Sequence, residues 1–461
     1  MKAIIAATLI GVILMFASVT MKNKSSVVSV ATVLLFLLLG VNIWEVYDAA
    51  QPGATGAQSF FNNMLRLDSF ALWFSLLMTG CTLLYVLLMG KEIARVGVHV
   101  GEYFALISFI LVGIYLLSGY NNLLMLFLGI EILSIPQYIL AGSDKRNLKS
   151  SEAALKYFLM GSFSTGILLM GIALLYGATG TFDILGFRML QTESLNSMAL
   201  AGILFLIIAL GFKVSAAPMH MWTPDVYDGS PTPFTAYMST VVKAGVFVAF
   251  LRLFHASFGN LSDHWMLIVS IITAATLLVG NITAVFQQSV KRMLAYSSIA
   301  QAGFMLFAIL AVNATAWQGI IIYAVAYSVA SIGVFAVLMK MKDYTYDGFN
   351  GLAKKEPVLA FFAAVFLFSL AGIPLTGGFM AKYFVLLAAV QQGQVMWLVI
   401  FALLMAAISA YYYFKVIIAM YFKPGTPELV SEVSGYDKLM LGITCALVIL
   451  IGILPQWFLN A

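Results

Sequence analysis

Charged side chains are scarce in this chain. Asp, Glu, Lys and Arg together make up 9% of its 461 residues, whereas a soluble globular domain typically contains about 25%. Hydrophobic residues make up 62% of the chain, and the mean hydropathy is +1.00. This composition excludes a soluble globule and predicts an all-α, polytopic membrane protein with no segment left over for a sizeable soluble domain.

Cysteine and histidine are also sparse, which bears on cofactor binding. The two cysteines, Cys81 and Cys445, lie in apolar runs with neither a CxxC spacing nor a neighbouring histidine, so we interpret both as packing residues. The four histidines are scattered without metal-ligand spacing, and no glycine-rich phosphate loop follows a strand. We therefore expect no nucleotide, metal or redox cofactor in this chain.

Long apolar runs, separated by Gly, Pro and charged loops, dominate the sequence. Because a hydrocarbon core of about 30 Å requires about 20 apolar residues per helix, a chain of this length accommodates about fourteen spans. The runs predict helices at residues 3–20, 27–46, 69–89, 101–118, 121–140, 152–177, 198–228, 233–256, 263–286, 291–312, 315–341, 357–391, 394–421 and 437–458. The first run also resembles the apolar core of a signal peptide. It is long for one and lacks a clear A-x-A cleavage site, so we interpret it as a span.

The loops on the two sides of the predicted membrane differ strongly in basic residues. Loops on one side contain fifteen: Lys22, Lys24, Lys91, Arg95, Lys145, Arg146, Lys149, Lys291, Arg292, Lys340, Lys342, Lys354, Lys355, Lys423 and Lys438. Loops on the other side contain four: Lys2, Arg66, Arg188 and Arg252. Since basic residues favour the cytoplasmic side, the bias predicts that both termini lie outside.

The seventh and twelfth predicted helices are longer than one span requires and contain Pro218 and Pro374 near their middles. A proline inside a helix frees the carbonyl four residues earlier, such as that of Leu370, and at membrane depth this group needs a polar cavity or a neighbouring helix. Lys213 lies five residues before the first proline, and Lys382 lies eight residues after the second. A simple proline kink is the alternative, but the nearby lysines favour broken helices of the kind that line transport sites.

The order of the spans predicts two inverted five-helix repeats. Helices four to eight form one unit, and helices nine to thirteen form another. Each unit crosses the membrane an odd number of times, so the second unit enters it from the opposite face. The broken helix is the fourth member of each unit, as in transporters built from inverted repeats. We expect an N-terminal three-helix segment (1–100), a first five-helix repeat (101–258), a second, inverted repeat (259–424) and a C-terminal transmembrane helix (425–461).

Four charged residues lie deep inside predicted spans: Glu131, Lys213, Lys243 and Lys382. A charge at mid-membrane costs roughly 2.5–3.5 kcal/mol on insertion scales, so such residues normally face a polar interior and mark an ion or proton path. The Glu131 carboxylate needs a cationic partner, for which Lys213 is the best candidate, although a static structural salt bridge is the alternative role. Lysine suits a proton relay because burial brings its neutral form within reach, whereas arginine stays charged.

Other polar residues in the predicted spans are candidates for the same relay. His220 follows shortly after the first proline and is a candidate relay group. Helices ten and eleven supply groups that can organise water between the lysines: Tyr296, Ser297, Ser298, Gln301, Gln318, Tyr323, Tyr327, Ser328 and Ser331. Interhelical hydrogen bonding that merely packs the helices is the alternative role for each of them.

Several charged residues are expected nearer the basic side. Lys156 and Lys415 are interpreted as snorkelling lysines. Glu152, Asp225 and Asp228 are expected at helix ends on that side, where a carboxylate either takes part in proton uptake or caps a helix.

Five segments, in order along the chain, closely resemble the antiporter-like membrane subunits of respiratory complex I. They are FLGIEILSIPQYIL, SSEAALKYFLMGSFSTG, GFKVSAAPMHMWTPDVYDGSPTPFTAYMSTVVK, VKRMLAYSSIAQAGF and LAGIPLTGGFMAKYFVL, of which WTPDVYDGSPTP is the most specific. L-type subunits have a long C-terminal extension, and M-type subunits usually have a glutamate in helix twelve. With Lys382 there and its end at Ala461, this chain resembles the N type.

The resemblance implies fourteen helices, two inverted five-helix units with broken helices 7 and 12, and proton translocation driven by quinone reduction elsewhere in the complex. It also implies roles for single residues. Glu131 would pair with Lys213, Lys243 would be the central lysine, and Lys382 the exit-side lysine. Gln301 departs from the family, in which histidine is frequent at this point, so a water-linked amide would replace a titratable group there.

We therefore expect a proton-translocating subunit of a bacterial NADH:quinone oxidoreductase, located in the inner (cytoplasmic) membrane and without a redox centre of its own. FMN, iron-sulfur clusters and quinone are expected in partner subunits. The expected partners are the other membrane-arm subunits of complex I and the lipid bilayer, with no nucleic acid. The alternatives are a subunit of a multisubunit Na+/H+ antiporter or membrane-bound hydrogenase, and a passive scaffold.

Overall fold

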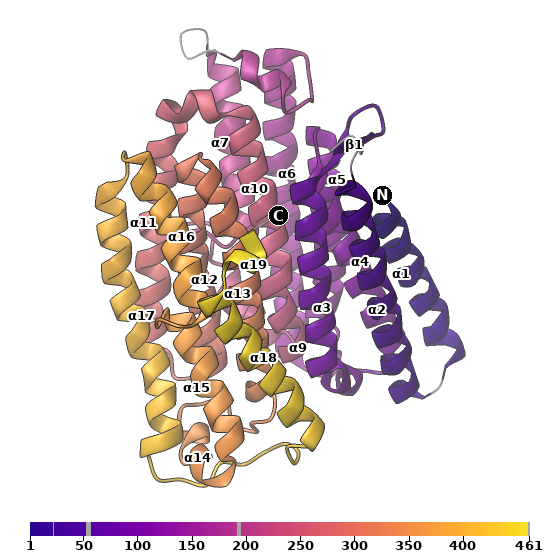
Figure 1. Cartoon of the computed structure of the whole chain (residues 1–461), viewed down its shortest axis with the longest axis vertical. Coiled ribbons are helices and arrows are strands. Elements are labelled where there is room, and N and C mark those ends of the chain that lie inside the picture. Colours follow the sequence, from indigo (N-terminus) through magenta and orange to yellow (C-terminus); the bar gives the residue numbers. More distant parts are fainter. Residues whose placement is uncertain (22, 52–56, 191–194, 460–461) are drawn as a thin grey trace.

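The structure is a computed structural model that describes residues 1–21, 23–51, 57–190 and 195–459. Lys22, one of the basic residues used to orient the chain, lies outside the described residues. The helices run along one long axis and form an elongated bundle (Figure 1). Twelve helical segments of the described residues are long and apolar enough to cross a membrane, which confirms the helical, multi-span fold predicted from composition.

The elements follow one another in this order. The first part contains α1 (Lys2–Thr20), α2 (Lys24–Ala49), β1 (Ala57–Phe60), β2 (Leu65–Asp68), α3 (Ser69–Val96), α4 (Val100–Gly119), α5 (Leu123–Ala141) and α6 (Leu148–Thr179). The middle part contains α7 (Ser197–Lys213), α8 (Thr223–Gly229), α9 (Thr232–Tyr237), a π-helical turn (Met238–Val242), α10 (Lys243–Ser257), α11 (Ser262–Val285), α12 (Val290–Ala311) and α13 (Ala314–Leu338). The last part contains α14 (Leu352–Lys355), α15 (Pro357–Ala371), α16 (Gly377–Gln392), α17 (Met396–Phe422), α18 (Gly435–Ile453) and α19 (Gln456–Leu459).

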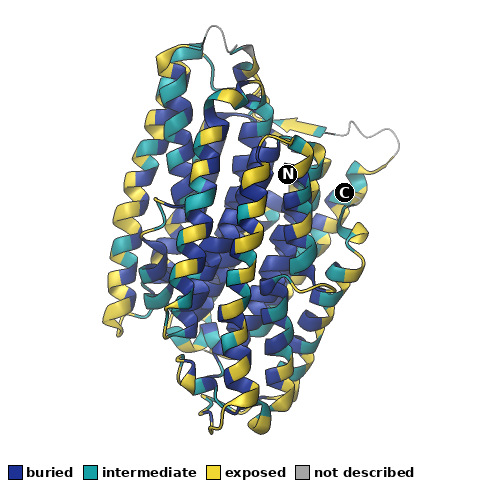
Figure 2. Cartoon of the chain, turned by 90° about the vertical axis from the view of Figure 1, so that its left-hand side faces the viewer, coloured by how far each residue is buried: buried dark blue, intermediate teal, exposed yellow. Residues whose placement is uncertain are grey.

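Three helices occupy the centre of the bundle. In α13, and in the segment formed by α9, the π-helical turn and α10, every residue of the most apolar stretch is buried, and α12 is almost as enclosed. Helices α1, α2, α6, α17 and α18 are the least buried spans, and several of them turn large apolar side chains outward, as lipid-facing helices do. On the side of the bundle seen in Figure 2, exposed positions lie on the outer helices and buried positions lie behind them. Most polar residues in the apolar stretches of α10, α12 and α13 are therefore enclosed by protein rather than exposed to lipid. Gln318, near the start of α13, is an exception, because it is exposed.

Both helices that were predicted to be broken are interrupted. Helix α7 ends at Lys213 and α8 begins at Thr223, and α15 ends at Ala371 before α16 begins at Gly377. The intervening backbone is irregular, with a positive φ of 89° at Gly372. A helix end leaves carbonyl groups without partners in their own helix, so each break places free backbone acceptors inside the bundle.

A short β-hairpin between α2 and α3 was not predicted. Strands β1 and β2 pair antiparallel, with Ala57 opposite Asp68 and Phe60 opposite Leu65. Each strand has only four residues. A period-2 pattern over so few residues cannot be distinguished from a loop in the sequence. The π-helical turn before α10 was also unexpected, because nothing in the residue types distinguishes it from an α-helix.

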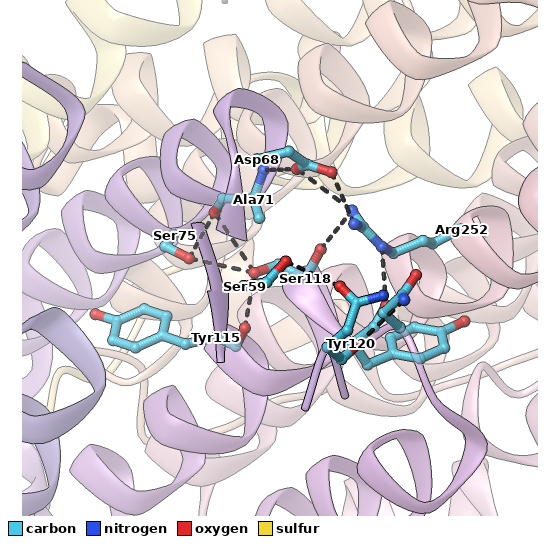
Figure 3. A network of polar contacts seen from close by, with 10 residues as sticks. Ser59, Asp68, Ala71, Ser75, Tyr115, Ser118, Tyr120 and Arg252 are labelled. Atoms are coloured by element: carbon cyan, nitrogen blue, oxygen red, sulfur yellow. Dashed lines mark hydrogen bonds and ion pairs between the residues drawn. The ribbon is translucent and has the colours of Figure 1, made fainter. Parts of the chain in front are cut away.

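Arg252 is not a loop residue, as the count of basic residues assumed, but a buried residue of α10 that is 7% exposed. Its guanidinium forms an ion pair with Asp68, the N-cap of α3, at 2.7 Å. It also donates to the carbonyls of Tyr120, at 3.0 Å, and Ser118, at 2.9 Å (Figure 3). This arginine therefore connects α10 to α3 and to the end of α4, and each of the three nitrogens of its guanidinium donates to an oxygen.

Candidate functional site

Lys382 lies in α16 beside the break that precedes this helix, and it is 7% exposed. Its Nζ donates to the carbonyls of Leu370, at 3.2 Å, and Ala371, at 2.9 Å, the last two residues of α15. A Cβ on Gly372 would come within 3.1 Å of the lysine Cδ, so the lysine packs closely against the break. The carbonyl that Pro374 was predicted to free is thus an acceptor for the buried amine.

Gln301 of α12 contacts the same break and connects two tyrosines to it. Its Nε2 donates to the carbonyl of Leu370 at 3.0 Å and to the hydroxyl of Tyr413 at 3.2 Å, and its Oε1 accepts a hydrogen bond from Tyr323. Tyr413 also bonds to the hydroxyl of Ser297. The structure therefore brings Gln301 and Tyr323 together with Lys382. Tyr413 of α17 was missed because its position in an aromatic run of the sequence suggests only packing.

Lys243 is the first residue of α10, directly after the π-helical turn, and it is 2% exposed. Its Nζ donates to the hydroxyl of Ser298 at 2.6 Å and to the carbonyl of the same residue at 3.1 Å. Ser298 is adjacent in α12 to Ser297, which bonds to the Tyr413 hydroxyl. Ser298 thus contacts Lys243 directly, whereas Ser297 contacts Tyr413, which also accepts a hydrogen bond from Gln301 beside Lys382. Helix α12 therefore links Lys243 to Lys382.

Glu131 and Lys213 are close but not in direct contact, which differs from the expected ion pair. The Glu131 carboxylate accepts a hydrogen bond from Thr165 of α6 at 2.7 Å. Lys213 donates to the hydroxyls of Ser134, at 2.8 Å, and Tyr138, at 3.2 Å. Ser134 follows Glu131 by nearly one turn of α5, so its hydroxyl takes the place of the carboxylate as the lysine's partner. Within the described residues the two side chains form no hydrogen bond or ion pair with each other.

A group of aromatic rings fills the space between Lys213 and Lys243. Tyr138 packs edge-on against Tyr157 with 4.8 Å between centroids, and Tyr157 stacks on Trp222 at 4.6 Å. The ring of Tyr227 lies 5.8 Å from the Lys243 Nζ. Between these two lysines the described residues contribute rings and their hydroxyl groups rather than charges. Nothing in the sequence indicated this group, because its members come from three different helices: α5, α6, and α8 with its N-cap Trp222.

Two predicted relay residues lie apart from these contacts. Tyr296 is partly buried against apolar neighbours and makes no hydrogen bond within the described residues. His220 lies in the irregular segment between α7 and α8, and its buried Nδ1 has no hydrogen-bond partner in the described part of the chain. The geometry therefore gives neither residue a contact with the three lysines.

The carboxylates expected on the basic side form a charged cluster. Lys156 pairs with Glu152 and Asp225, both at 2.8 Å. Arg292 pairs with Asp225 at 3.2 Å and with Asp228 at 3.9 Å. These residues line a cavity of about 180 Å³. Lys156 is thus a member of an ion-pair cluster rather than a free snorkelling lysine.

The chemistry of Lys243 and Lys382 follows from their acceptors. Within the described residues each amine has two oxygen acceptors, none of them a carboxylate. A neutral amine has two N–H bonds and a lone pair, whereas an ammonium has three N–H bonds. Two neutral acceptors match the neutral amine and leave its lone pair free to accept a proton. Arg252, held by Asp68, is the contrasting case of a fixed charge.

Known proteins are similar to this chain in both sequence and fold. Residues 120–409 match the family described as "NADH:quinone oxidoreductase/Mrp antiporter, TM". NADH-quinone oxidoreductase subunit N from Trichlorobacter lovleyi is 41% identical over 89% of this chain and 86% of its own length, and that from Cytophaga hutchinsonii is 39% identical over 100% and 99%. A chain of respiratory complex I from Thermus thermophilus superposes with a TM-score of 0.84 at 29% identity, covering 100% of this chain and 99% of that one.

Proposed function

The chain belongs to the NADH:quinone oxidoreductase/Mrp antiporter family of membrane subunits, and from this membership we propose that it is the N-type, proton-translocating membrane subunit of a respiratory complex I. Its relatives named subunit N match it along nearly the full length of both chains. In this role the chain is part of an enzyme, NADH:quinone oxidoreductase, and moves protons while partner subunits transfer electrons.

The observation that carries this proposal is the presence of two fully enclosed lysines with only neutral acceptors. Lys243 and Lys382 are 2% and 7% exposed. Lys243 bonds to Ser298 of α12, and Lys382 shares the Leu370 carbonyl with Gln301 of the same helix. A buried amine that is not held by a carboxylate can take up and release a proton, which is what a relay requires. We assign Glu131, Lys213, Lys243 and Lys382 to the relay, with Gln301, Ser298 and Tyr323 as polar groups between the lysines.

The domain arrangement of the proposal follows the predicted repeats. Residues 101–258 and 259–424 are the two antiporter-like units, 1–100 the N-terminal three-helix segment and 425–461 the C-terminal helix. The interruptions after α7 and α15 support this division, because each falls late in its unit. The chain lies in the bacterial inner (cytoplasmic) membrane with both termini outside, as the bias of basic residues suggests.

The redox groups belong to the partners in this proposal. FMN, iron-sulfur clusters and quinone lie in other subunits, and no redox centre is assigned to this chain. The partners are the other membrane-arm subunits of complex I and the surrounding lipid. Copurification tests this assignment: flavin- and iron-sulfur-containing partners support it, whereas an entirely membrane-embedded set of partners would favour a Na+/H+ antiporter. A passive scaffold is disfavoured by the cost of burying Lys243 and Lys382 where, within the described residues, no carboxylate pairs with them.

The test of the proposal compares two lysines. Lys382→Ala is expected to abolish coupled pumping in proteoliposomes while the complex still assembles, because the amine beside the break is removed. Lys415→Ala is the matched control, since this lysine of α17 lies over the ring of Tyr346, at 4.1 Å, and outside the proposed relay. Unchanged pumping in Lys382→Ala would refute the assignment.

A further inference from the structure

Lys291, which the sequence suggested was a loop residue of the basic side, is a buried residue in the first turn of α12. It is 5% exposed. Its Nζ donates to the carbonyls of Asp228, at 2.8 Å, and Ser230, at 2.7 Å, where α8 ends. A surface lysine would keep its ammonium in water. This one is instead directed into the protein.

The contacts of Lys291 repeat those of Lys382. Each amine donates to two backbone carbonyls at the end of a half-helix, and within the described residues neither forms an ion pair with a carboxylate. The two acceptors again match a neutral amine and leave its lone pair available. The proposed relay does not use this lysine, although its acceptors are of the same kind as those of Lys382.

One side of Lys291 borders the charged cluster on the basic side. The next residue, Arg292, and the residue that supplies one of its carbonyls, Asp228, both line the cavity of about 180 Å³. Asp228 thus both lines the cavity and accepts a hydrogen bond from Lys291 through its carbonyl. Glu152, which lines the same cavity, has a side chain that is 62% exposed, so the cavity is in contact with the aqueous side.

Lys291 also lies on the face of α12 that leads to Lys243. Ser298 follows Lys291 by seven residues, about two helical turns or about 10 Å, and therefore lies on the same face of the helix. The Ser298 hydroxyl accepts the hydrogen bond from Lys243. Lys291 thus lies between an aqueous charged cavity and the first fully enclosed lysine of the relay.

We infer that Lys291 is the proton-uptake residue of this subunit, taking protons from the Asp228 side of the charged cavity and passing them towards Lys243. The inference rests on the proposed function. In the uptake step the O–H bond of a protonated carboxyl group or of water breaks as an N–H bond forms at the neutral Lys291 amine. An N–H bond of the resulting ammonium then breaks as the proton moves on along α12. No electron is transferred.

A purely structural role would make Lys291 a cap for the carbonyls at the end of α8, and two variants separate the roles. Lys291→Gln keeps N–H donors for the carbonyls but cannot hold a proton, and Lys291→Arg keeps donors and charge but cannot release one. We expect both to assemble and to lower the protons pumped per electron pair by about tenfold, since a positioned proton-transfer group contributes at least that much. Lys342→Gln, an exposed lysine of the same side, is the control.

Normal pumping in both variants overturns the inference, because a cap alone would then suffice. Normal pumping in Lys291→Arg alone also overturns it, because a fixed charge would then suffice. If neither variant assembles, Asp228→Asn decides, since it leaves the backbone carbonyl in place; the expected result is slower proton uptake, and an unchanged rate overturns the inference. Lys382→Ala in the same assay isolates the proposed function: if that variant pumps normally, the function fails rather than the uptake site.

Discussion

Lys382 and Gln301 donate to the same backbone oxygen, the carbonyl of Leu370, at 3.2 and 3.0 Å. This oxygen is free because the helix α15 ends there, so the broken helix itself supplies the point where α12 and α16 meet. Any change in the side chain of Gln301 therefore alters the surroundings of the buried amine without touching the amine itself.

Gln301→Leu tests that relationship. It leaves the hydroxyls of Tyr323 and Tyr413 without the amide partner and removes one donor from the Leu370 carbonyl. We expect a loss of stability of about 1–3 kcal/mol and a reduced ratio of protons pumped to electrons transferred. Gln301→His, which keeps a polar side chain, is expected to retain pumping. Equal pumping by the Leu and His variants would show that this position has no part in the relay.

Gly372→Ala tests whether the shape of the break positions Lys382. The glycine has φ of 89°, and an added Cβ would meet the lysine Cδ at 3.1 Å. Gly393→Ala is a matched control, because Gly393 has φ of 81° and open space around its Cβ. Both variants should lose about 1–2 kcal/mol of stability from left-handed backbone. Only Gly372→Ala should impair pumping; the same pumping defect in both would assign the effect to backbone strain.

Ser134→Ala tests the contact that replaces the direct Glu131–Lys213 pair. The hydroxyl of Ser134 accepts a hydrogen bond from Lys213 at 2.8 Å and lies on the helix of the glutamate. Without it the lysine retains Tyr138 alone, so we expect weaker coupling between electron transfer and pumping in proteoliposomes. Thr179→Val, which removes a hydroxyl at the far end of α6, is the control. Coupling equal to that of the control would show that the Ser134 hydroxyl has no part in coupling electron transfer to pumping.

Arg252→Gln tests the contrasting, fixed charge. Removing one partner of a buried ion pair costs about 3–5 kcal/mol, and less here because the Asp68 side chain is 30% exposed. We expect a lower thermal unfolding temperature and less assembled complex. The protons pumped per electron pair by the complex that assembles should be unchanged. A selective loss of pumping at normal stability would instead place Arg252 in the proton path.

The sequence was sufficient to predict the helical, multi-span fold, the two breaks, and the burial of Lys243 and Lys382. Apolar run length and charge cost depend on residue type alone, so Pro374 and Lys382 could be recognised without knowing their neighbours. The acceptor of the amine was also partly predictable, because a proline identifies the carbonyl that it leaves free, here that of Leu370.

Contacts that depend on the relative orientation of packed helices could not be predicted from the sequence. Tyr413 is one of three consecutive tyrosines, and only packing places its hydroxyl on Ser297 and Gln301. Lys213 contacts Ser134 rather than Glu131, which lies less than one turn earlier in α5, and only the orientation of α5 decides which of the two faces the lysine. Lys291 appeared to be a loop charge because it stands at a helix start, where burial depends entirely on the neighbouring end of α8.

Lys243→Gln tests whether an enclosed lysine without a carboxylate partner transfers protons. The amide keeps N–H donors for Ser298 but cannot hold a proton. The measurement is the ratio of protons pumped to electrons transferred by the assembled complex in proteoliposomes. We expect this ratio to fall sharply in the variant. A ratio equal to that of the unmodified complex would show that Lys243 does not transfer protons.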